Sequence, residues 1–108
     1  MAKKINESLN SIKILREIEA RRKEIRKFGV KKLVLIGSYA NNTAHGNSDI
    51  DLLVEFKEGR GLFDDYVHLS QFLRGLFKKE VDIGDAHLIR DEIKQSILGG
   101  KKFEAKIC

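Results

Sequence analysis

Apolar residues recur along this chain with two different periods, one typical of helices and one typical of strands. Across residues 8–28 they follow three- and four-residue spacing, which predicts an amphipathic helix that ends at Gly29. Residues 32–36 then form a short, β-branched-rich run that a glycine ends, and this predicts a buried strand. Residues 49–56 alternate between polar and apolar side chains, which predicts a second strand.

The second half of the chain continues this succession of helices and strands. Residues 62–77 have helical spacing, Val81 and Ile83 mark a short strand, and a last helix is expected from residue 89 or 90 to 98. A short helix is expected around residues 39–42, and the tail 101–108 is either a final strand or a frayed end. The elements together predict an α/β (α+β) fold: a small mixed sheet of three to four strands with helices packed on it. Three phenylalanines are assigned to the core: Phe63, Phe72 and Phe77. Tyr39 is expected either in the core or in the wall of the nucleotide pocket.

Two carboxylates share one face of the second predicted strand. Asp49 and Asp51 are two residues apart and so point the same way, roughly 7 Å from each other, while the alternate positions are apolar. Like charges at this distance raise each other's pKa unless a cation lies between them. Oxygen ligands with no neighbouring Cys or His favour a hard divalent ion such as Mg²⁺. Taken alone, the pair could equally be the solvated face of an edge strand that Glu55 continues.

A glycine-serine turn precedes the carboxylates. Gly37 allows the backbone to approach a ligand closely, and Ser38 is expected to cap the short helix that follows. Free amides at the start of a helix attract anions, so this turn is suited to phosphate. Phosphate-binding and metal-binding groups about a dozen residues apart predict a nucleoside triphosphate site, although the chain has no P-loop motif.

The combined motif, Gly37-Ser38, ten residues, then Asp49-x-Asp51, resembles the signature of the DNA polymerase beta-like nucleotidyltransferase superfamily, and within it the minimal nucleotidyltransferases. That family has a third carboxylate on a later strand, and Asp82 in Glu-Val-Asp-Ile-Gly matches it. The resemblance covers most of the chain, from the leading helix to the closing helix.

Two positions qualify the resemblance. Asp85 competes with Asp82 for the place of the third carboxylate, but it follows a glycine and is interpreted as a turn or cap residue. The family often has the sequence Gly-Ser-x-Ala-Arg-Gly at this turn. This chain has Asn41 and Asn42 in place of the arginine and the second glycine. That departure concerns nucleotide contacts and leaves the carboxylates unchanged.

The resemblance implies a function and a set of roles. Asp49, Asp51 and Asp82 would bind two Mg²⁺ ions, Gly37 and Ser38 would orient the phosphates of ATP, and AMP would pass to an acceptor hydroxyl. Minimal nucleotidyltransferases are commonly antitoxins that adenylylate a tyrosine of a HEPN-domain ribonuclease toxin, so a HEPN-type partner is expected. The alternative is a catalytically weak binding module that neutralises a partner by contact, and modification of RNA 3′ ends ranks third.

Length, charge and cysteine content limit the remaining interpretations. The 108 residues are expected to form one domain, 1–108. The net charge of +5 is concentrated in residues 1–32, which hold eleven Lys/Arg and four Glu, so triphosphate, RNA or an acidic protein are candidate contacts. A solvated helix face is the simpler interpretation, since Phe28 is the only aromatic residue among these charges.

Cysteine and histidine positions point to no metal site of the zinc type. His45, His68 and His87 lack zinc-ligand spacing, and the single cysteine, Cys108, has no partner for an internal disulfide. The start of the chain has no apolar signal sequence, and no apolar run approaches the ~20 residues of a membrane span. We therefore expect a cytoplasmic protein that is not inserted in a membrane.

Overall fold

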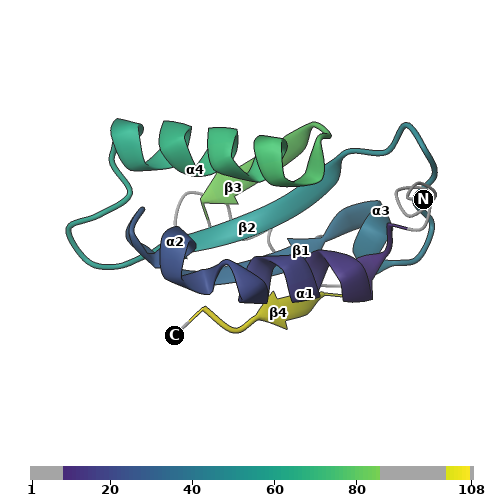
Figure 1. Ribbon diagram of the computed structural model, residues 1–108, viewed down its shortest axis with the longest axis horizontal. Helices are drawn as coiled ribbons and strands as arrows, with labels where there is room; N and C mark the ends of the chain where they lie inside the picture. Colours follow the sequence, from purple (N-terminus) through teal and green to yellow (C-terminus); the bar gives the residue numbers. More distant parts are fainter. Residues whose placement is uncertain (1–8, 86–101, 108) are drawn as a thin grey trace, which may run out of the picture.

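A four-stranded mixed sheet forms the centre of the molecule in the computed structural model, which describes residues 9–85 and 102–107. The strand order is β3-β2-β1-β4: β1 pairs antiparallel with β2 and β4, and β2 pairs parallel with β3. The predicted mixed sheet is confirmed (Figure 1). The strands are β1 (Val30–Ile36), β2 (Ile50–Phe56), β3 (Val81–Asp85) and β4 (Phe103–Ala105).

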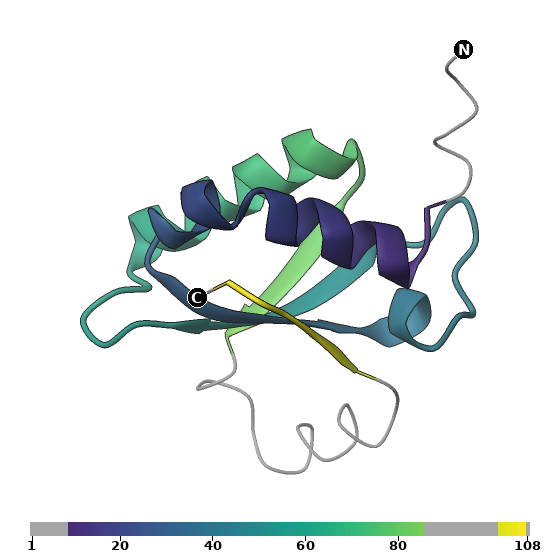
Figure 2. The ribbon, with the colours of Figure 1, turned by 60° about the horizontal axis from the view of Figure 1, so that its bottom comes forward.

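Three helices cover one face of this sheet, and a fourth, very short helix continues β1 (Figure 2). They are α1 (Ser11–Ala20), α2 (Arg22–Arg26) and α4 (Phe63–Phe77) on the face, and α3 (Gly37–Ala40) at the end of β1. The prediction of a helix at 62–77 is confirmed within one residue. Of the two alternatives for the tail, a final strand or a frayed end, the structure has the strand, β4. The helix expected from residue 89 or 90 to 98 lies outside the described residues, as do His87 and Cys108.

The single helix predicted over residues 8–28 is wrong, because the described part of this segment forms two helices. The break lies at Arg21, whose φ of −106° and ψ of 18° are not helical. The first helix starts after Asn10, whose side-chain oxygen accepts a hydrogen bond from the Lys13 amide at 2.9 Å and so caps the helix. Apolar spacing continues through a break of this kind, so periodicity alone does not reveal it.

The core lies between the sheet and the three covering helices. Ile14 and Ile18 of α1 and Leu69 and Leu73 of α4 are fully buried against the apolar face of the strands. Phe63 was assigned to this core, and that prediction is wrong, since Phe63 is 79% exposed. It is the first residue of α4 and precedes the buried stripe of the helix, while the other two assigned phenylalanines pack at the edge of the core.

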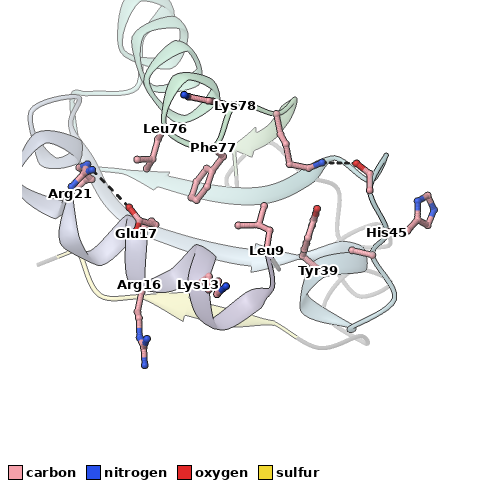
Figure 3. A pocket seen from close by; sticks show the side chains of 13 residues that line it. Leu9, Lys13, Arg16, Glu17, Arg21, Tyr39, His45, Leu76, Phe77 and Lys78 are labelled. Carbon is pink, nitrogen blue, oxygen red and sulfur yellow. Dashed lines mark hydrogen bonds and ion pairs between the residues drawn. The ribbon is translucent and has the colours of Figure 1, made fainter. Parts of the chain in front are cut away.

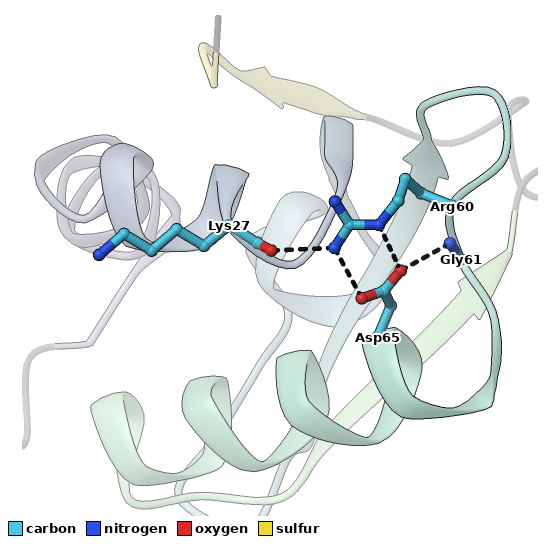
Figure 4. Close-up of polar contacts among 4 residues, drawn as sticks. All are labelled: Lys27, Arg60, Gly61 and Asp65. Carbon is cyan, nitrogen blue, oxygen red and sulfur yellow. Dashed lines mark hydrogen bonds and ion pairs between the residues drawn. The ribbon is translucent and has the colours of Figure 1, made fainter.

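An arginine holds the β2–α4 connection to the end of α2 (Figure 4). The Arg60 guanidinium donates to both carboxylate oxygens of Asp65 at 2.8 Å and to the Lys27 carbonyl at 2.9 Å. The Gly61 amide donates to the same carboxylate at 3.0 Å. These hydrogen bonds, above all the one from Arg60, lower the pKa of Asp65 to about 2. The network fixes where α4 begins.

Within the described residues, no helix is long and apolar enough to cross a membrane.

Candidate functional site

The register of the sheet brings two of the predicted carboxylates side by side. Asp51 of β2 pairs with Asp82 of β3 across the parallel ladder, and with Ile36 of β1 on its other side. Neighbouring strands lie about 4.8 Å apart, and directly paired residues point to the same face of a sheet. Leu52 and Ile83, the next residues of the two strands, point into the core. Asp51 and Asp82 therefore lie together on the sheet face opposite the covering helices.

Asp49 lies just outside the strand that was predicted to contain it. The strand β2 begins at Ile50, whose amide donates to the Glu80 carbonyl at 3.1 Å and so ties the start of β2 to the start of β3. Asp49 is exposed, yet its negative charge raises the pKa of Asp51. The three predicted aspartates are thus brought into one electrostatic group, although the first and the last are 33 positions apart in the sequence.

The electrostatics of this group are unfavourable in the absence of a cation. The pKa of Asp51 is raised, mainly because burial removes water from its carboxylate, and further by the negative charges of Asp82 and Asp49. None of the three carboxylates forms an ion pair with a described residue. A divalent cation would relieve both the repulsion and the lost hydration, and the donors present are the hard oxygens that Mg²⁺ prefers.

The carboxylates do not form a complete metal cage. In residues 9–85 and 102–107, no three carboxylate, imidazole or thiol side chains are gathered closely enough to hold an ion by themselves. Magnesium is usually bound by one or two protein carboxylates, with water and substrate phosphates as its other ligands. The donor set therefore fits an ion that is shared with a phosphorylated substrate.

Gly37 lies directly over Asp51, and only glycine fits there. Its φ is +76°, and a Cβ atom at this position would overlap the Asp51 carboxylate oxygen Oδ2 and lie 3.1 Å from Asp51 Cβ and Cγ. A side chain would therefore both strain the backbone and displace the carboxylate. This close approach is the reason that the turn and the carboxylate form a single site.

Ser38 does not cap the helix, so that prediction is wrong. The residue before α3 is Ile36, no side chain caps the helix, and Ser38 is its second residue. The turn is closed from the other end instead. Asn41 Nδ2 donates to the Gly37 carbonyl at 3.0 Å, and the Thr43 amide donates to the Ser38 carbonyl at 2.9 Å. Asn41, which differs from the related motif, thus supports the backbone of the glycine-serine turn.

Two further residues concern the loop that leads to Asp49. The Lys79 ammonium group donates to the Gly46 carbonyl at 2.9 Å and so fastens this loop to the turn after α4. The two residues are 33 positions apart, so no sequence signal indicates their contact.

Asp85, interpreted from sequence as a turn or cap residue, is instead the last residue of β3 and pairs with Val54. It is three positions from Asp82, and alternation places it on the opposite face of the strand.

Comparison with known proteins agrees with this geometry. The model of the nucleotidyltransferase domain family matches residues 13–108. The chain is 44% identical over 72 residues to "Putative protein adenylyltransferase MJ0435" of Methanocaldococcus jannaschii, which covers 67% of this chain and 76% of that protein. It is 34% identical over 89 residues to the protein adenylyltransferase MntA of Thermococcus cleftensis, which covers 78% of this chain and 89% of that protein.

Solved structures share the fold. One described as a "putative minimal nucleotidyltransferase" has a TM-score of 0.66 at 30% identity and covers 87% of this chain and 95% of its own. A toxin-antitoxin structure with AMP-PNP has a TM-score of 0.64 at 24% identity, covering 90% and 73%. A tri-AMPylated HEPN toxin of Shewanella oneidensis with its MNT antitoxin gives 0.58 at 18%, covering 84% and 71%. The matched family model, the two relatives and the shared fold establish that this chain belongs to the nucleotidyltransferase domain family, as a minimal nucleotidyltransferase, and that it is an enzyme.

Proposed function

We propose that this protein is a magnesium-dependent adenylyltransferase that transfers AMP from ATP to a tyrosine hydroxyl of a partner protein. The tyrosine oxygen would bond to the α-phosphorus of ATP as the bond from that phosphorus to the oxygen bridging to the β-phosphate breaks, and pyrophosphate would leave. The observation that carries the proposal is the placement of Asp51 beside Asp82 and beneath Gly37. That placement puts the Gly37 backbone, which a phosphate can approach closely, next to two neighbouring carboxylates. ATP and Mg²⁺ are abundant in the cytoplasm, where we expect the enzyme to act.

Each residue of the site has a proposed role in the reaction. Asp49 and Asp51 would hold two Mg²⁺ ions together with water and the phosphates of ATP. Asp82 would be a ligand of the ion on the acceptor side and could receive the proton of the attacking hydroxyl. The bound metal would supply charge neutralisation for the phosphates of ATP. Gly37 and Ser38 would orient the β- and γ-phosphates through their backbone, which lies close to the Asp51 carboxylate. Positioning of this kind is the main requirement of phosphoryl-type transfers.

The acceptor we propose is a HEPN-type ribonuclease toxin, which makes this chain its antitoxin. Two structural neighbours are toxin-antitoxin structures, one of them with an AMPylated HEPN toxin. Two relatives are named protein adenylyltransferases, which favours a protein acceptor over RNA. A tyrosine hydroxyl suits the reaction because it is a donor and acceptor with a pKa near 10. An added AMP would place bulk and negative charge where RNA phosphates must approach.

The experiment that tests this function uses the purified chain with ATP, Mg²⁺ and the product of the adjacent gene. We expect intact-mass spectrometry to show the partner gaining the mass of one or more AMP groups, and the partner's ribonuclease activity to fall as the mass increases. Peptide mapping should place the added groups on tyrosine. Inhibition of the ribonuclease with no mass change would favour instead the alternative of a binding module that acts by contact alone.

A second prediction separates the two candidates for the third carboxylate. Because Asp82 pairs with Asp51 and Asp85 lies on the other face, Asp82→Asn should slow AMP transfer by more than about 100-fold while ATP affinity changes little. Asp85→Asn should retain transfer within a few-fold of the wild type. Single-turnover rates and calorimetric ATP affinities of both variants provide the measurement. The reverse result, an active Asp82→Asn and an inactive Asp85→Asn, would assign the role to Asp85.

A further inference from the structure

A groove of about 850 Å³ lies on the helix-covered side of the sheet (Figure 3). Its walls come from α1, from the end of α4 with the turn that follows, and from the loop after α3. Asp51 and Asp82 lie on the opposite face of the sheet, so the groove is separate from the proposed ATP site. Its volume is within the range of small-molecule binding sites, ~300–1,000 Å³.

Positive charge dominates the lining of this groove. Glu17 is the single acid among the described residues that line it, and it already faces Arg21 at 3.9 Å. The Lys79 ammonium group is engaged with the Gly46 carbonyl. Lys13 and Lys78 form no ion pair with any described residue, so their ammonium groups are available to an anion. Among the described residues, five lysines and arginines line the groove: Lys13, Arg16, Arg21, Lys78 and Lys79. Of these, Arg16 points away from it in Figure 3.

Aromatic and aliphatic side chains form the interior of the same groove. Phe77 is half-buried, and the hydroxyl end of Tyr39 points into the space between α1 and α4 (Figure 3). Leu9, Ala44 and Leu76 also belong to the apolar lining. Cationic walls beside aromatic rings match a ligand that carries both phosphate and base, since bases stack on aromatic side chains and phosphates pair with lysine. An acidic peptide would satisfy the lysines but not the aromatic interior.

We propose that this groove binds a phosphorylated nucleoside, held by Lys13 and Lys78 at its phosphates and by Phe77 at its base. The ligand chemistry has two sources, a free nucleotide or single-stranded RNA. The site differs from the ATP site in position and in its independence of metal. Its occupancy therefore rests on α1 and α4 and does not require the carboxylates.

The test measures binding of a fluorescent adenylate RNA of about eight nucleotides by anisotropy, with EDTA present to silence the metal site. Wild type and the Asp49→Asn, Asp51→Asn variant should bind alike. Lys13→Gln with Lys78→Gln should weaken binding at least about tenfold. It should also reduce the slope of log affinity against log salt by about 1.4, which is ~0.7 for each lost phosphate contact on a single strand. Lys79 is left unchanged because it fastens the loop before Asp49.

The matched control removes the same charge elsewhere. Lys23 and Lys57 are exposed and do not line the groove, so Lys23→Gln with Lys57→Gln should bind RNA as the wild type does. Displacement of the RNA by AMP identifies the ligand as a free nucleotide, and displacement by unlabelled RNA alone identifies it as RNA. Equal loss in the control pair, loss in the carboxylate variant, or binding of poly-glutamate in place of RNA overturns the proposal. Because no transfer is measured, these outcomes are independent of the proposed enzymatic function.

Discussion

Replacing Asp49 and Asp51 together by asparagine is expected to abolish magnesium-dependent ATP binding and to lower AMP transfer by more than about 100-fold. The substitutions keep the shape of both side chains but remove the charge that would hold the metal. They also remove a repulsion that raises the pKa of Asp51, so the metal-free variant should be no less stable than the wild type. Isothermal titration with ATP, with and without Mg²⁺, gives the affinity, and thermal melting reports folding.

The sign of the stability effect follows from the direction of the pKa shift. A carboxyl whose pKa is raised on folding destabilises the native state once it is ionised, so the penalty is present above that raised pKa and disappears as pH falls below the ordinary value. The melting temperature of the variant should therefore exceed that of the wild type at neutral pH and approach it in acid. Unchanged ATP affinity in a folded variant would falsify the role of the two aspartates as metal ligands.

Gly37→Ala is expected to have the second large effect, a loss of ATP binding and transfer of more than about 100-fold that arises from a single added methyl group. The new Cβ would overlap Asp51 Oδ2, so the carboxylate must move away from the place where it meets Asp82. The backbone φ of +76° adds a strain of about 1–2 kcal/mol for any L side chain. Activity and melting temperature should therefore both fall.

Gly59→Ala separates the strain from the displaced carboxylate. Gly59 has a φ of +79°, nearly the same as that of Gly37, but an added Cβ there would meet no atom of the described residues within 4 Å. Both variants should lose stability, as measured by thermal or denaturant unfolding, and Gly37→Ala should lose more because its Cβ also overlaps Asp51. Only Gly37→Ala should lose activity. If the two alanine variants are equally active, the close approach of Gly37 to Asp51 has no catalytic importance.

The sequence determined the elements whose hydrophobic pattern is strong and local. The buried run in residues 32–36, the alternation after Asp49 and the helical spacing of residues 62–77 each appear in the structure within one or two positions. Gly37 and Asp51 are close together because their spacing follows from a local unit: a strand, a glycine turn, a short connection and an antiparallel return strand. Local spacing alone thus brings Gly37 near Asp51.

Local patterns did not determine features that depend on which surface a neighbour covers. The exposure of Phe63, the break at Arg21 and the position of Ser38 inside α3 were all missed, because helical periodicity does not show where a helix bends or where its packing partner ends. Arg60 of the Arg60–Asp65 network also donates a hydrogen bond to the carbonyl of Lys27, which is 33 positions away in the sequence. Such contacts arise only when separate elements are packed.

Tertiary structure also decided the electrostatics of both proposed sites. The parallel register of β2 and β3 places Asp82 beside Asp51, and a shift of one residue would have turned Asp82 to the other face. The basic residues of α1 line the same groove as Tyr39 and Phe77, although α1 itself contains no aromatic residue. Sequence specifies residue types and short-range spacing, whereas charge pairs between distant residues exist only once the strands are registered and the helices are packed on them.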